Sequence, residues 1–139
     1  MGRRLVTAAV GASIVAASCA GCFSDNKPTE KNARITVDNN SVTSHAVSCS
    51  QVQFLLTANI KADPGNVRLL LKLDSDKPKI ESVHIDNFEG FTGVADAGAG
   101  DAAVAAANGR FTVTGNAEGS KINDPRVSLT APFKIEVGC

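Results

Sequence analysis

The sequence has no tryptophan and no tyrosine among its 139 residues, and six phenylalanines make up its Phe, Tyr and Trp content. The usual aromatic platforms for stacking sugars or bases are therefore missing, and the phenylalanines are expected in the core. The chain also lacks an excess of positive charge, because 14 basic residues balance 14 acidic ones. Nucleic-acid binding needs clustered Lys and Arg that neutralise phosphates, so no nucleic-acid partner is expected.

Residues that carry catalytic or metal chemistry are also scarce. The two histidines, His45 and His84, are expected on separate strands, and we interpret them as structural or exposed rather than as a metal pair. Five aspartates lie in or near expected loops, but their spacing matches no calcium-binding loop: Asp74, Asp76, Asp86, Asp96 and Asp101. We therefore expect no enzyme activity, no cofactor and no metal. A cleft joining His84 to two of Asp74, Asp76 and Asp86 would restore an enzymatic interpretation.

The first 22 residues have the pattern of a bacterial lipoprotein signal. Arg3 and Arg4 precede an uncharged apolar run over residues 5–18. This run is shorter than the roughly 20 residues of a membrane span, and it suits the apolar region of a signal peptide. Ala20-Gly21 supply the small residues that a signal peptidase needs, and Cys22 supplies a thiol that would accept diacylglycerol. With an added N-acyl chain, Cys22 would exceed the two signals needed for stable anchoring.

Two alternatives to this assignment remain open. Cleavage could precede Cys19, which stands where such signals usually have Leu, or the segment could be an ordinary secretory signal. We favour lipidation at Cys22 because residues 23–33 have the polar composition of a flexible tether. The expected organisation is a signal peptide over 1–21, a lipidated cysteine and tether over 22–33, and a β-rich domain over 34–139. The expected location is the extracytoplasmic face of the cell membrane.

From Arg34 onward, apolar and polar residues alternate with the period of β-strands. Residues 52–60 and 67–73 form two such runs around a Pro-Gly turn, and they are expected to pair as a hairpin. Leu55 and Leu70 are apolar on the otherwise polar face of these runs. That face is therefore expected to be partly covered, which motivates a second functional hypothesis below.

The remaining strands are expected to be short and separated by turns. Ile80 is out of step with the alternation that follows it, which indicates a β-bulge. Residues 102–107 are alanine-rich and would suit a helix, but Asn108-Gly109 is typical of a type I′ hairpin turn, and we favour the hairpin. The expected fold is mainly β: a single antiparallel β-sandwich or open barrel-like domain of about 7–8 short strands with one disulfide.

Cys49 and Cys139 are the cysteines that remain after the signal junction. In an exported protein two cysteines most simply pair, although two free thiols are the alternative. A bond between them would close a loop of about 90 residues, and the chain-entropy model gives a stabilisation on the order of 4 kcal/mol for such a cross-link, less any strain.

Four segments together resemble one known family: Ala20-Gly21-Cys22, Val47-Ser48-Cys49, Arg110–Ala117 and the C-terminal Pro132–Cys139. The chain resembles the mycobacterial 19 kDa lipoprotein antigen family over most of its mature part. The resemblance implies an acylated cell-envelope lipoprotein with a β-rich domain and a disulfide at the two matching cysteines. It also implies a surface antigen that host Toll-like receptors sense through its acylated N-terminus, with a link to adhesion. No catalytic residue is carried over.

Two functional hypotheses follow from these observations. The first is a membrane-anchored envelope lipoprotein whose non-catalytic β-domain has an antigen, adhesion or envelope role. The alternative is a carrier that holds a lipid or another apolar ligand in the mouth of the β-domain. A packed interior would count against the carrier.

Overall fold

The computed structural model describes residues 31–139. The expected signal peptide, Cys22 and nearly all of the expected tether lie outside these residues. Within them, no helix has the length and apolar character needed to cross a membrane.

Ten β-strands make up the described part of the chain. They are β1 (Ala33–Val37), β2 (Asn40–Ser44), β3 (Val47–Val52), β4 (Leu55–Lys61), β5 (Asn66–Lys72), β6 (Lys79–Phe88), β7 (Phe91–Asp96), β8 (Asp101–Ala107), β9 (Arg110–Lys121) and β10 (Asp124–Gly138).

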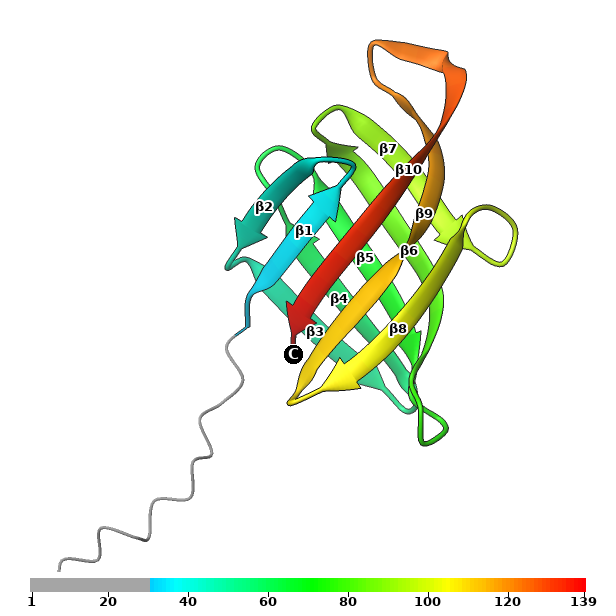
Figure 1. The fold of residues 1–139 in the computed structure, drawn as a ribbon. Coiled ribbons are helices and arrows are strands. Elements are labelled where there is room, and N and C mark those ends of the chain that lie inside the picture. Colours follow the sequence, from blue (N-terminus) through cyan, green and yellow to red (C-terminus); the bar gives the residue numbers. More distant parts are fainter. Residues whose placement is uncertain (1–30) are drawn as a thin grey trace, which may run out of the picture.

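All ten strands belong to one antiparallel sheet with the order β2-β1-β10-β9-β7-β6-β5-β4-β3, and β8 pairs with β9 beside this path. The sheet folds over itself, so that β1, β10, β9 and β8 lie in front of β3 to β7 in Figure 1. The expectation of an antiparallel, open barrel-like domain is therefore confirmed. The number of strands is ten rather than seven or eight.

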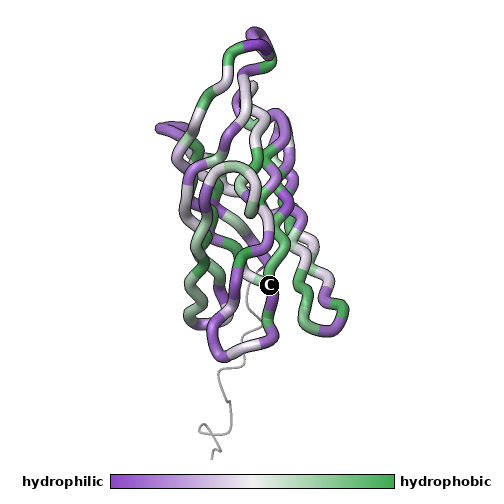
Figure 2. Tube along the Cα trace, turned by 90° about the vertical axis from the view of Figure 1, so that its right-hand side faces the viewer, coloured by the Kyte–Doolittle hydropathy of each residue, from purple (hydrophilic) through white to green (hydrophobic). Residues whose placement is uncertain are grey.

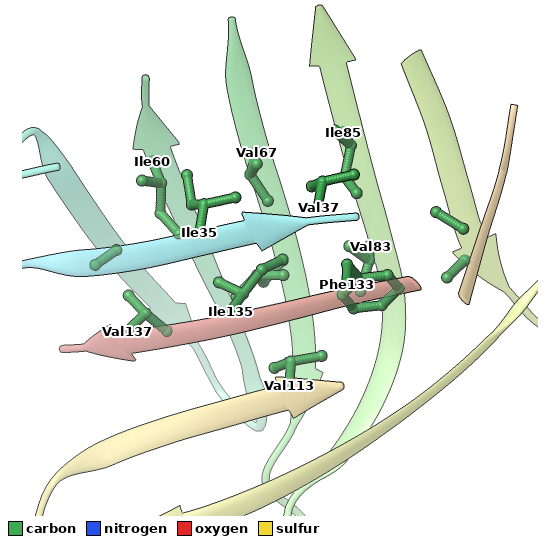
Figure 3. Close-up of a cluster of buried hydrophobic side chains, with 14 of the residues drawn as sticks. Ile35, Val37, Ile60, Val67, Val83, Ile85, Val113, Phe133, Ile135 and Val137 are labelled. Atoms are coloured by element: carbon green, nitrogen blue, oxygen red, sulfur yellow. The ribbon is translucent and has the colours of Figure 1, made fainter. Parts of the chain in front are cut away.

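The core lies between the two halves of the folded sheet. Hydrophobic and hydrophilic residues alternate along many of the strands (Figure 2), and β4 and β5 accordingly bury every second residue. In Figure 3, Ile35 of β1 and Ile135 of β10 project toward Ile60 of β4 and Val67 of β5. The buried apolar residues are Ala33, Ile35, Val37, Leu56, Ala58, Ile60, Val67, Leu69, Leu71, Val83, Ile85, Phe88, Phe91, Ala95, Val113, Ala117, Ala131, Phe133, Ile135 and Val137.

The alanine-rich stretch is a strand, as the hairpin prediction required. β8 ends at Ala107, Asn108 and Gly109 both have positive φ (53° and 74°), and β9 begins at Arg110. Two consecutive positive φ angles are the signature of a type I′ turn. The bulge expected near Ile80 is also present, because the β5–β6 register shifts between Leu70 and Leu71.

The hairpin expected from 52–60 and 67–73 exists as β4 paired with β5, but its first strand is shorter than expected. The chain turns at Gln53-Phe54, where Gln53 has a φ of 55°, and Val52 belongs to the preceding strand β3. Val52 and Phe54 therefore do not point into the core; they are 70% and 59% exposed. The apolar–polar alternation of the sequence runs through this turn without a break. The turn was not predicted because it contains no Gly, Pro, Asn or Asp.

Candidate functional site

The expected disulfide joins Cys49 of β3 to Cys139, which follows β10. The two Cα atoms are 5.8 Å apart, and 90 positions separate the residues along the chain. β3 is an edge strand and has no backbone pairing with β10. The bond therefore connects two parts of the barrel that the sheet hydrogen bonds leave unconnected.

The chain enters the domain beside this disulfide. The Asn32 backbone carbonyl accepts a hydrogen bond from the Gly138 N–H at 3.0 Å, and the Asn32 side-chain oxygen accepts one from Arg110 at 2.7 Å. The first and last described residues thus lie at the same end of the barrel, the lower end in Figure 1. We call this the proximal end, and we define it by Lys31, Asn32, Cys139 and the β3–β4 and β8–β9 turns.

A groove opens at the proximal end between the two halves of the sheet. Its volume is about 420 Å³. Its apolar lining comes from Leu56, Leu73 and Phe111 together with the disulfide, and Lys31 and Gln51 stand at it as polar residues. The space deeper in the barrel is filled by the core side chains, several of which have no exposed surface.

A second, more polar groove of about 370 Å³ crosses the outer face of β4 to β7. Its lining includes His84 and Asp86 of β6, Arg68 of β5 and Asn59 of β4, and Arg68 Nε donates to Asn59 Oδ1 at 3.1 Å. One aspartate therefore accompanies His84, whereas the enzymatic interpretation required two.

The other two aspartates considered with His84 are in the loop between β5 and β6, outside this groove. Asp74 is paired with Lys72 at 3.2 Å, and Asp76 follows it in the same loop. The expectation that both histidines lie on strands is wrong for His45, which lies in the connection between β2 and β3, whereas His84 is on β6. Among residues 31–139, no group of three or more His, Cys, Asp or Glu side chains is placed to hold a metal ion.

Two sets of exposed apolar residues lie at opposite ends of the barrel, and of these sequence alternation placed only Leu55 on an outer face. Val52, Phe54 and Leu55, the last 43% exposed, surround the β3–β4 turn at the proximal end. Ile122 and Val127, 64% and 47% exposed, belong to the β9–β10 hairpin, which projects from the opposite end in Figures 1 and 2. The one signal available in the sequence was a run of apolar residues, Phe54-Leu55-Leu56, too continuous for a strand with one polar face.

Comparison with known proteins agrees with the sequence resemblance. The model of the Mycobacterium 19 kDa lipoprotein antigen family matches residues 26–139. A protein of Mycobacterium avium subsp. hominissuis that is named as a lipoprotein is 31% identical over 96% of this chain and 94% of its own length. LppE of Mycobacterium tuberculosis, also named as a lipoprotein, is 31% identical over the full length of both chains.

Proposed function

The chain belongs to the Mycobacterium 19 kDa lipoprotein antigen family, and from this membership we propose that it is a membrane lipoprotein anchored through Cys22. The anchor holds the protein on the extracytoplasmic face of the cell membrane. The β-domain is a non-catalytic module that the anchor presents from the cell envelope.

The family match, together with the Ala20-Gly21-Cys22 triplet, supports the anchor, and the position at which the chain enters the domain decides which end of the barrel lies nearest to it. Asn32 is held beside Cys139 by two hydrogen bonds, and Cys139 is in turn bonded to Cys49, so the chain leaves the barrel from one rigid end. Asn32 follows Cys22 by ten positions, a length of chain that can span at most about 36 Å. An anchor at Cys22 therefore keeps the proximal end near the membrane.

The opposite end of the barrel is then the end farther from the point of anchoring. It carries the projecting β9–β10 hairpin, whose exposed Ile122 and Val127 are large apolar side chains of the kind found in protein contact surfaces. We propose that this end is the part presented to other molecules, including host receptors, in keeping with the antigen role that the family name expresses.

Fractionation of cells that express single cysteine variants tests the anchor. Wild type and Cys19→Ser are expected in the membrane fraction as the processed, acylated form, because Cys22 is intact in both. Cys22→Ser is expected to accumulate as an unprocessed and non-acylated precursor. Normal acylation of Cys22→Ser, or its loss in Cys19→Ser alone, would move the anchor to Cys19 and contradict the proposal.

The groove at the proximal end favours a second candidate function, the carriage of an apolar ligand. A volume of about 420 Å³ is within the roughly 300–1,000 Å³ of small-molecule sites. The packed interior counts against this role and limits any such ligand to the mouth of the barrel. Lipid analysis of protein purified from its host tests this role: a bound lipid should be lost in Leu73→Glu at the groove and kept in Leu70→Glu on the outer face. Protein without any extractable lipid would count against the carrier.

A further inference from the structure

The β3–β4 turn presents an apolar surface that is not buried in the fold. Val52, Phe54 and Leu55 are 70%, 59% and 43% exposed, and together with Lys72 and Glu81 they line one shallow hollow. We call these three apolar residues the turn patch. Turns are usually built from small or polar residues, and a contiguous apolar surface on a small domain commonly marks a contact site.

The turn patch is held in place by hydrogen bonds on both sides. The Gln51 side chain donates to the Gln53 carbonyl at 3.0 Å, and the Leu73 N–H donates to the Phe54 carbonyl at 2.7 Å. The second bond ties the turn to the residue that follows β5. Phe54 is therefore presented outward by a defined backbone and does not have to be ordered when it makes a contact.

The turn patch lies at the end of the barrel where the chain enters. Gln51, next to Val52, lines the same groove as Lys31 and Cys139, and Leu73 of that groove is bonded to Phe54. The segment that leads back to Cys22 spans at most about 36 Å. A lipid bilayer holding the anchor would thus be within reach of the patch, at the high effective concentration that a short linker produces.

We propose that the turn patch docks on the lipid bilayer, with Phe54, Val52 and Leu55 inserted at the boundary between headgroups and acyl chains. This docking rests on the proposed anchor and adds an orientation to it. Lys72 lines the same hollow as the inserted residues, together with Glu81, and its side chain is long enough to reach the headgroups while its apolar stem stays against the protein. The anchor and its short linker already hold the domain at the membrane surface, so docking does not have to overcome the entropy of bringing it there. Weak insertion is therefore enough to keep the turn patch on the bilayer.

A membrane is a better occupant for this patch than a second copy of the chain. The anchor supplies the membrane to the proximal end of every molecule, whereas a second copy must be brought there by diffusion. The other exposed apolar pair, Ile122 and Val127, provides an internal comparison because it is at the far end of the same domain. Docking through the turn patch would hold that pair away from the bilayer.

The absence of tryptophan allows a direct test. Phe54→Trp and Ile122→Trp each introduce the single tryptophan of the chain at a site more than half exposed. The full-length variants, purified as the mature protein from host membranes, are reconstituted into phosphatidylcholine vesicles with and without brominated acyl chains. Flotation of the vesicles reports the anchor, and quenching by the brominated lipid reports which end touches the bilayer.

We expect both variants to float with the vesicles. Emission from Phe54→Trp should shift to shorter wavelength and be largely lost in brominated vesicles, and emission from Ile122→Trp should be unchanged. Adding Val52→Asp to Phe54→Trp should restore much of the lost emission. Flotation without quenching at position 54, or equal quenching at both positions, would overturn docking and leave the anchor standing.

Two further results would also overturn the proposal. A wavelength shift at position 54 that grows with protein density, without quenching by brominated lipid, would assign the patch to a second copy. Failure of both variants to float would overturn the anchor, and with it the docking that rests on the anchor.

Discussion

Removal of the disulfide should cost the domain a large part of its stability. The double variant Cys49→Ser/Cys139→Ser deletes the cross-link between β3 and the end of β10, two segments without mutual backbone pairing. For a separation of 90 positions, the chain-entropy model gives about 4.5 kcal/mol of lost stability. Domains have about 5–15 kcal/mol in total, so the loss would leave the variant marginal or unfolded at 37 °C.

Urea unfolding followed by far-ultraviolet circular dichroism measures this loss, since the chain has no tryptophan to report it. With an m value of about 1–3 kcal/mol/M, the midpoint should fall by about 1.5–4.5 M. Reduced wild-type protein is the matched control and should unfold near the midpoint of the double variant. A double variant less than about 1 kcal/mol below the oxidised wild type would refute the reasoning, because the cross-link would then not restrict the unfolded chain.

Three smaller changes test other parts of the account by the same unfolding assay. Ser44→Ala should cost about 1–3 kcal/mol of stability, because the buried Ser44 hydroxyl donates to a carbonyl of β4 and accepts from a backbone N–H. The exposed control Ser48→Ala should cost less than about 0.5 kcal/mol. Equal losses in the two variants would contradict the structural role given to the Ser44 hydroxyl. Gly119→Ala should cost about 1–3 kcal/mol or more through overpacking, since its Cβ would lie 1.9 Å from a β7 carbonyl oxygen, whereas Gly98→Ala meets only a carboxylate oxygen at 3.4 Å and should be nearly neutral. Phe54→Ala should change stability by less than about 0.5 kcal/mol because the ring is exposed; a loss above 2 kcal/mol would make Phe54 a structural residue and remove the reason to assign it a contact role.

Sequence patterns predicted the fold class because alternation and turn chemistry are local properties. Asn108-Gly109 marked the β8–β9 hairpin against the helix propensity of the alanines before it, and both residues have the positive φ of that turn. Ile80 is out of step with the apolar–polar alternation that follows it, and this irregularity predicted the bulge in β6. In each case the residues that produce the geometry are the residues that carry the signal.

The extra strands came from turns without such signals. Gln53-Phe54 contains none of the usual turn residues, and Gln53 adopts positive φ even though this region favours Gly and Asn. The break between β2 and β3 is organised by the Ser44 hydroxyl, which bonds across to the carbonyl of Lys61, 17 positions away. The same hydroxyl accepts a local bond from the Ala46 N–H, but its long-range bond to Lys61 exists only after the sheet has folded, so the sequence alone does not predict it.

Some features of the candidate sites could likewise be predicted from local sequence and others could not. The pairing of Cys49 with Cys139 could be predicted because the number and compartment of cysteines limit the choices. The exposure of Phe54 could not, because an apolar residue in an alternating run is expected to be buried. The meeting of Lys31, Gln51, Leu73 and Cys139 at one groove depends on how the sheet closes, which is set by pairings between distant segments such as β1 with β10.

The most direct test of the central claim is mass spectrometry of the native mature N-terminus. If the protein is anchored as proposed, the first residue is Cys22, and it carries a thioether-linked diacylglycerol and an N-acyl chain. The next residues are then Phe23 and Ser24. A mature protein that begins at another residue, or a Cys22 without lipid, would contradict the account.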